Sequence, residues 1–245
     1  MTFDKYKQYT QARVGLGNHG PALPTAAWLE FSYQHAAAVD AIHEPWNFEN
    51  LKNFPTEVLS TQIQDREEYL LRPDKGRRLS DASRLLLNEL PKNEKPSVLI
   101  VASNGLSSFA VTHHLENYLS EVLMDLTKEQ IPLCAEKVFL VPNARVGLID
   151  DIGAILRPTI GLMIIGERPG LSSADSLAMY LTYRPEHGRS DADRNCISNI
   201  RPPFGLSYTE ARLKTMFLIR ESIRRQLSGV HLKDESNLLT TVNPN

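Results

Sequence analysis

The stretch of sequence that decides the fold runs from residue 158 to residue 200. It opens with the apolar run IGLMII at residues 160–165, which breaks at once into GERPGL at residues 166–171. A short apolar run bounded by Pro and Gly predicts a strand that is buried on both faces. Ligands of open α/β sheets bind in the crevice beyond the carboxyl ends of such strands. Residues 166–171 can offer backbone donors, one carboxylate and one guanidinium there, so we expect a binding site at this loop.

Length and composition indicate a soluble globular protein with a sizeable core. The chain has 245 residues, is 42% hydrophobic and 23% charged, and carries a formal net charge of −2. The absence of a basic tract argues against nucleic acid as the main partner, and no apolar stretch approaches the roughly 18 residues of a membrane helix. Cys134 and Cys196 form no CxxC, so neither a disulfide framework nor a zinc site is expected and the reducing cytoplasm fits.

Strands and helices alternate through the second half of the chain. The patterns predict strands at residues 97–102, 138–141, 160–165 and 177–183. A long helix with apolar residues from Val111 to Leu126 follows the first strand, and a helix over about residues 149–156 follows the second. A capping box, Ser207-x-x-Glu210, opens the last helix, which Gly229 is expected to end. This order predicts an α/β fold: a Rossmann-like parallel sheet flanked by helices.

A mainly helical N-terminal region precedes this sheet. Helices are expected after Thr25 as the capping residue, over about residues 57–69, and through residues 85–90, with a loop carrying aromatic anchors at residues 45–55. The composition changes at PKNEKP, residues 91–96. We therefore predict three parts, which are a helical region at residues 1–95, a Rossmann-like domain at residues 96–232 and a flexible tail at residues 233–245.

Two motifs allow more than one interpretation. Residues 15–20, GLGNHG, match GxGxxG, but a polar segment precedes them and Pro21 and Pro24 follow where a phosphate-binding helix should begin, so a glycine-rich arm is favoured over a dinucleotide site. Residues 72–78 carry three arginines. They suit either a clamp on phosphate or carboxylate groups or a solvated helix start with local ion pairs, and the residues alone favour the ion pairs.

Other candidate groups point away from a self-contained hydrolase. His113 and His114 are adjacent on a predicted helix and are expected to point apart, so that they cannot share a metal ion. Asp150 and Asp151 suit a helix N-terminus. No HExxH, GxSxG or GxxxxGK[ST] motif occurs.

Four loops are therefore expected to meet at the carboxyl edge of the sheet: residues 104–108, 145–146, 166–171 and 195–199. Glu167 could accept hydrogen bonds from a ligand amide or pair with Arg168. Cys196 could be an apolar contact for a ring, ordinary core or a reactive thiol, and the thiol ranks last because no neighbouring His activates it.

The strings at these loops resemble the small (light) subunit of ethanolamine ammonia-lyase. They are YLLRPDKGRRL at residues 69–79, SNGLS at residues 103–107, IGERPGL at residues 165–171 and DRNCISNI at residues 193–200, and the resemblance covers about residues 12–228. The N-terminal part departs from the family pattern at Asn18, at Leu23 before Pro24-Thr25, and at Gln34 before His35.

The resemblance implies a lyase that converts ethanolamine to acetaldehyde and ammonia with adenosylcobalamin. It implies that a large subunit holds ethanolamine and carries out the radical chemistry, that this chain has no catalytic residue and is inactive alone, and that the domain at residues 96–232 binds the cofactor through Val146, Glu167 and Cys196. No Asp-x-His-x-x-Gly string occurs, so cobalt is expected to keep the cofactor's own base and this chain to supply no metal ligand.

Two other functions stay open on the residues. A self-contained nucleotide-dependent oxidoreductase could use the Rossmann-like sheet, although residues 104–107 offer a single glycine where a fingerprint loop needs several. A structural interaction protein would leave the loop at residues 166–171 without a role. No nucleic-acid or membrane partner is expected, and the expected location is the cytoplasm or a bacterial microcompartment within it.

Overall fold

A mixed sheet of six strands lies at the centre of the computed structural model, which describes residues 4–7, 9, 12–18, 20–48, 51, 53–91 and 96–236. Across the sheet the strand order is β1-β3-β2-β4-β5-β6. The strands are β1 (Thr56–Val58), β2 (Val98–Ser103), β3 (Leu133–Leu140), β4 (Ile160–Gly166), β5 (Leu177–Tyr183) and β6 (Arg194–Ile200). The first four strands in this order are parallel, whereas β5 is antiparallel to β4 and β6 is antiparallel to β5.

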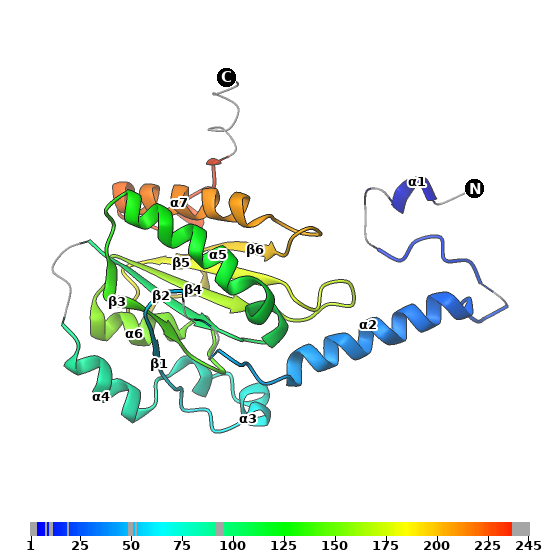
Figure 1. Ribbon diagram of the computed structural model, residues 1–245, viewed down its shortest axis with the longest axis horizontal. Helices are drawn as coiled ribbons and strands as arrows, with labels where there is room; N and C mark the ends of the chain where they lie inside the picture. The colour runs from blue at the N-terminus through cyan, green and yellow to red at the C-terminus, as the bar shows by residue number, and fades with distance from the viewer. Residues whose placement is uncertain are drawn as a thin grey trace, which may run out of the picture.

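Helices cover both faces of the sheet, giving three layers (Figure 1). The helices are α1 (Asp4–Lys7), α2 (Thr25–His43), α3 (Arg66–Leu71), α4 (Asp81–Glu89), α5 (Ser108–Lys128), α6 (Leu148–Leu156) and α7 (Tyr208–Arg225). The helices α5 and α7 pack together on one face, while α6 and α4 lie on the other. The helix α2 projects away from the sheet, and α1 lies above its outer half in this view (Figure 1). Among the described residues, none of the helices combines the length and apolar character that spanning a membrane requires.

Alternation along the central strands creates two apolar cores. In β2, Val98, Ile100 and Ala102 join the core beneath α5 and α7. Leu99 and Val101 point to the opposite face and join the core beneath α6. Both sets are fully buried because helices cover the two faces, which is why these strands are continuously apolar. The predicted α/β fold with a helical N-terminal region is confirmed, and its parallel part comprises β1, β3, β2 and β4.

The helix predicted over about residues 57–69 is wrong for its first half. Residues 56–58 form β1, and α3 begins only at Arg66. The carbonyl of Pro55 accepts from Val138 N–H and the carbonyl of Leu140 accepts from Leu59 N–H, so the edge of β3 binds this segment. Backbone pairing with a distant strand outweighs the local helical pattern here. The division at residue 95 stays a prediction, although this N-terminal segment pairs with the sheet.

The loop predicted at residues 195–199 is also wrong, because these residues form the edge strand β6. Cys196 pairs with Tyr180 of β5. The side chain of Asn195 donates to the carbonyls of Gly229 and Leu232 and accepts from Gly229 N–H, which fixes the segment after α7 against the sheet. Residues 237–245 of the predicted flexible tail lie outside the described residues.

Helix ends differ from the sequence expectations at two places. Pro24, not Thr25, occupies the N-cap position of α2 and makes no side-chain cap. The capping box of Ser207 and Glu210 at α7 is confirmed, but the helix ends at Arg225, with Gln226 in the left-handed conformation, before Gly229 is reached. Residues 15–18 and 20, from the GxGxxG match, lie outside the sheet.

We predict that Gly105→Ala destabilises the chain more than Gly188→Ala does. Both glycines have positive φ, +50° and +99°, so each variant meets the left-handed penalty of about 1 kcal/mol. At Gly105 a Cβ would also lie 2.3 Å from Ile165 Cγ1 and 2.5 Å from the Gly166 carbonyl, whereas nothing lies within 4 Å at Gly188. The clash adds about 1–3 kcal/mol in urea unfolding. Equal losses for the two variants would contradict this packing.

Candidate functional site

The loops after β2 and β3 are bound to each other at the carboxyl edge of the sheet. Asn143 N–H donates to Asn104 Oδ1 at 2.8 Å, and Ala144 N–H donates to Ser103 Oγ at 3.0 Å. The chain leaves β2 for the face covered by α5 and leaves β3 for the face covered by α6. This reversal is the topological switch point where open α/β sheets bind ligands.

Two adjacent hollows open at this edge. The larger one, of about 730 Å³, lies between residues 74–78, the start of α6 and the beginning of β6. The smaller one, of about 190 Å³, lies against the end of β4 and the loop after β2. Arg145, Val146 and Tyr180 line both hollows, so the two form neighbouring parts of one surface.

The structure brings the three predicted site residues to these hollows. Val146 lines both hollows, Glu167 lines the smaller and Cys196 lines the larger. Val146 follows β3 and Glu167 follows β4, as the positions of their loops predicted. Cys196 does not follow a strand. It lies within β6, and its pairing with Tyr180 of β5 places it at the hollow.

Glu167 ties three strands together. Ser176 Oγ donates to Glu167 Oε2, Ser198 Oγ donates to Oε1 at 2.5 Å, and Asn199 N–H donates to Oε2 at 3.0 Å. These partners, and not Arg168, bind the carboxylate. A carboxylate has about four acceptor positions, so one remains for a further donor.

Cys196 is held as a neutral thiol. Desolvation raises the pKa of the Cys196 thiol and the charge of Glu167 raises it further, while a hydrogen bond with Tyr180 acts in the opposite direction. Burial likewise raises the pKa of Tyr180. A thiol with a raised pKa is a poor nucleophile at neutral pH. The environment therefore favours the role of a small apolar contact, in agreement with the ranking from the sequence.

The comparisons with known proteins agree over nearly the whole chain. A family model for the ethanolamine ammonia-lyase light chain (EutC) matches residues 2–233. The chain belongs to this family. The ethanolamine ammonia-lyase small subunit of Pseudomonas fluorescens (strain Pf0-1) is 43% identical over 242 residues, covering 96% of this chain and 87% of that protein. The small subunit of Azotobacter vinelandii is 42% identical over 244 residues, covering 96% and 89%. The resemblance found at the sequence motifs is confirmed.

The arginines of this small-subunit family member divide between ion pairs and the larger hollow. Arg72 is paired with Asp74 at 2.7 Å and does not line the hollow. Arg78 lines the hollow and lies 3.4 Å from Asp151. Arg77 also lines the hollow, and it has no ion pair among the described residues. The predicted local ion pair is therefore present at Arg72, Arg78 pairs instead with Asp151 from a distant segment, and Arg77 is left to face a ligand.

Two further residues, Arg145 and Tyr180, line both hollows: sequence reasoning placed Arg145 at this edge without giving it a role, and it missed Tyr180. The Arg145 guanidinium lies 4.1 Å from the centroid of the Tyr69 ring and donates to the Tyr69 carbonyl at 2.8 Å. Its Nε is buried and has no hydrogen-bond partner among the described residues. The guanidinium of Arg66 also lies over the Tyr69 ring, 4.8 Å from its centroid. The string YLLRPDKGRRL contains Tyr69, but nothing in it signals that Arg145 stacks there.

Asp150 and Asp151 lie in the first turn of α6, as predicted, and their partners come from distant segments. Asp150 accepts two hydrogen bonds from Arg194, at 3.1 and 2.6 Å. Asp151 accepts from Leu79 N–H and Arg84 at 2.8 Å each and lies 2.7 Å from His187 Nε2. Burial acts to raise the pKa of Asp151, but these partners outweigh it and leave the pKa below its usual value of 3.8.

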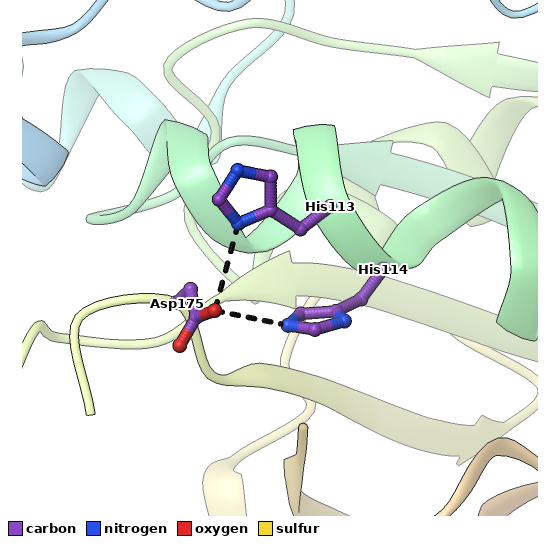
Figure 2. Close-up of side chains that lie close together, drawn as sticks. All are labelled: His113, His114 and Asp175. Atoms are coloured by element: carbon purple, nitrogen blue, oxygen red, sulfur yellow. Dashed lines mark hydrogen bonds and ion pairs between the residues drawn. The ribbon is translucent and has the colours of Figure 1, made fainter. Parts of the chain in front are cut away.

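The expectation that His113 and His114 point apart is wrong. Both rings approach the carboxylate of Asp175 (Figure 2). Consecutive helix residues differ by about 100° in direction. A histidine side chain is long enough to turn toward a group that lies between the two Cα–Cβ directions, and Asp175 occupies that position.

We predict that Asp151→Asn costs about 1–3 kcal/mol of stability near neutral pH, because the neutral amide can no longer pair with the half-exposed guanidinium of Arg84 and accepts at one oxygen only. The folded pKa of Asp151 is depressed below its usual value. Its contribution to the free energy of unfolding is therefore fully present above about pH 4 and is lost as the pH falls below that value. The difference between the variant and the unmodified chain should therefore shrink from pH 6 to pH 3 in urea unfolding. Asp40→Asn, at an exposed position of α2, serves as the matched control. A difference that stays constant with pH would contradict this assignment.

Proposed function

We propose that this chain is the small subunit of an adenosylcobalamin-dependent ethanolamine ammonia-lyase and that it binds one side of the cofactor against a large catalytic subunit. One observation carries the proposal. Val146, Glu167 and Cys196 come from three separate segments, and all three line the adjoining hollows at the switch point of the sheet. Membership of the small-subunit family supports the same function.

The residues of the hollows suit a corrinoid. A corrin ring has broad apolar faces and carries amide side chains, so its site needs apolar surface together with a few fixed polar groups. Val146, Cys196 and the Tyr180 ring supply apolar surface, and Glu167 keeps one acceptor position for an amide N–H. The buried Nε of Arg145 is a donor without a partner among the described residues, as expected where a ligand completes the hydrogen bonding.

Arg77 is the group that we assign to the phosphodiester of the cofactor's nucleotide tail. It lines the larger hollow, and its charge is not neutralised by an ion pair within the described chain. A guanidinium binds phosphate through charge-assisted hydrogen bonds. Arg78 lies next to it but shares Asp151 with Arg84 and His187. Arg77 therefore carries the larger share of the attraction for phosphate.

In this proposal the chain binds and orients the cofactor, and the large subunit carries out the reaction. When bound, adenosylcobalamin would supply the radical chemistry of hydrogen abstraction, acting on ethanolamine held by the large subunit. The thiol of Cys196 stays neutral at physiological pH and the Glu167 carboxylate is held by three donors, so neither group is prepared to take part in proton transfer. Their role is to fix the orientation of the cofactor and to exclude water from its covered face.

The exposed apolar side chains of α2 support a protein partner. Trp28, Leu29, Phe31, Tyr33 and Val39 are all exposed on this projecting helix. Apolar surface that is gathered on one element marks an interaction site. The proposal assigns this helix to assembly with the large subunit.

The decisive experiment joins the two chains. Acetaldehyde should form from ethanolamine only when this chain, a large subunit of the same enzyme and adenosylcobalamin are all present. In the assembled enzyme, Arg77→Gln should raise the cofactor concentration at half-saturation about tenfold, as expected for the loss of one charge-assisted hydrogen bond. The maximal rate should be unchanged, because the proposal assigns Arg77 to the phosphodiester of the cofactor and not to the reacting atoms.

Arg72→Gln is the matched control for that variant. It removes the same group from the same segment, but the Arg72 side chain does not line the larger hollow and only its partner Asp74 does, so half-saturation should move much less than in Arg77→Gln. Equal effects of the two substitutions would remove Arg77 from the site. Turnover of a nicotinamide cofactor by this chain alone would overturn the proposal in favour of an oxidoreductase.

Alkylation of Cys196 tests the site without relying on activity. Iodoacetamide should modify the Cys196 thiol slowly at pH 7 and faster above pH 9, because its pKa is raised. In the assembled enzyme, adenosylcobalamin should slow this modification severalfold, measured by mass spectrometry of the peptide. Cys134 is buried, and burial raises its pKa to about 11, so it is an internal control that stays unmodified. Labelling that is unaffected by the cofactor would place the corrinoid away from Cys196.

A further inference from the structure

Two imidazoles from α5 and a carboxylate from the connection between β4 and β5 converge on one point. His113 Nδ1 lies 3.5 Å and His114 Nε2 lies 3.3 Å from the same atom, Asp175 Oδ2 (Figure 2). The three atoms all lie within 4.8 Å of one another. The two histidines belong to α5, while Asp175 belongs to the segment that leads into β5.

Neighbouring groups hold each of the three in this orientation. His114 is buried, and its Nδ1 lies 2.9 Å from the Tyr208 hydroxyl, which leaves Nε2 directed at Asp175. The His113 ring stacks on Phe109 with centroids 5.8 Å apart. Arg201 Nη1 lies 3.8 Å from Asp175 Oδ1, so the other carboxylate oxygen serves both imidazoles.

We propose that His113, His114 and Asp175 form a site for a divalent transition-metal ion of the zinc class. Two imidazole nitrogens and one carboxylate oxygen are ligands that zinc accepts, whereas calcium and magnesium prefer sets made of oxygen alone. Neighbouring ligand atoms in a tetrahedral zinc site are about 3.3 Å apart, as follows from metal–ligand distances of about 2.0–2.1 Å. Both nitrogen–oxygen separations already match this spacing. Closing the nitrogen–nitrogen separation requires a small rotation of the His113 ring on Phe109, which the 53% exposure of its side chain allows.

The surroundings of His114 match those of a zinc-bound imidazole. A metal on Nε2 requires the proton on Nδ1, which then donates to the Tyr208 hydroxyl, and such a second hydrogen bond fixes the tautomer of metal-bound histidines. Three protein ligands leave a coordination position for water. The positive charge of Arg201 opposes a second cation, so the site should bind zinc less tightly than a four-ligand structural site does.

The ion would fasten α5 to the connection between β4 and β5. The neighbours of Asp175 are already engaged there, since Ser107 Oγ donates to the Ala174 carbonyl at 2.7 Å and Ser176 Oγ donates to Glu167. A metal at Asp175 would stiffen the segment that holds the Glu167 carboxylate. This site does not depend on the cofactor proposal, because its three ligands stand apart from the residues assigned to the corrinoid.

Metal titration of the full-length, chelator-treated chain tests the site. Zn²⁺ should bind with one-to-one stoichiometry in calorimetry, and Co²⁺ should give the visible absorption of a low-symmetry site with nitrogen and oxygen ligands. His113→Ala and Asp175→Asn should weaken binding by well over tenfold, and Tyr208→Phe, which removes the outer hydrogen bond, by about tenfold. His43→Ala and His231→Ala remove exposed histidines elsewhere and should leave the affinity unchanged.

Stability gives a second, independent readout. Because an ion that binds only the folded state stabilises it, Zn²⁺ should raise the melting temperature of the unmodified chain and of His231→Ala, but not that of Asp175→Asn. His113→Ala keeps the buried His114 contact and should fold, so a loss of zinc binding in it reports on the ligand set. Failure of Zn²⁺ and Co²⁺ to bind, or binding that survives both His113→Ala and Asp175→Asn, would overturn the proposal and leave a hydrogen-bonded His–Asp cluster.

Discussion

The buried ion pair of Arg194 and Asp150 is the interaction on which the geometry of the hollows depends. Arg194 begins the edge strand β6, Asp150 lies in the first turn of α6, and the guanidinium also donates to Thr182 Oγ1 at 2.9 Å. Both side chains are almost fully buried, so removal of either partner would leave an uncompensated charge in the interior. The pair fixes the start of α6, with Val146 just before it, relative to the strand that carries Cys196. The larger hollow exists because these two elements are held at this separation.

The polar groups of the site are mostly used to build it. Glu167 accepts from Ser176, Ser198 and Asn199, and so joins the ends of β4, β5 and β6. Asp151 performs a similar task by binding Leu79 N–H and Arg84 to α6. Groups that are hydrogen-bonded to several partners in this way cost little to keep in place and cannot easily change partners during a reaction. Such a site is suited to orienting a large ligand, in contrast to one that moves protons.

Local sequence pattern predicted the central elements, and distant pairing decided the others. The apolar runs of β2, β4 and β5 and the periodicity of α5, α6 and α7 are local properties, so they could be located from the sequence. The strand β1 has three residues and exists because β3 offers it an edge, while β6 is buried only at its first, fourth and seventh residues, within a string rich in polar groups. No local property distinguishes these segments from a helix or a loop.

The residues of the site likewise fall into those that local sequence pattern predicted and those that depend on distant pairing. Glu167 and Val146 follow predicted strands, so physical reasoning placed them at the correct edge, and the resemblance singled them out. Tyr180 and the stacking of Arg145 on Tyr69 could not be found in this way, because they depend on the register of β5 with β6 and on the packing of distant segments. The convergence of His113 and His114 was missed for a related reason. Helical geometry fixes the direction of each Cα–Cβ bond, but the partner that turns the rings is set by tertiary structure.

The contacts of Arg66 connect the projecting helix to the site. Its Nε donates to the carbonyl of Ile42 near the end of α2 at 2.6 Å, and its Nη1 donates to the Gly105 carbonyl and to Asn143 Oδ1, in the loops after β2 and β3. Its guanidinium also stacks on Tyr69, which in turn carries Arg145 on the edge of both hollows. A subunit that packed on the apolar side chains of α2 would thus act on a helix whose end is bonded to the loops of the switch point. Assembly and ligand binding would then share the same set of hydrogen bonds, so that ordering one of them lowers the entropic cost of the other.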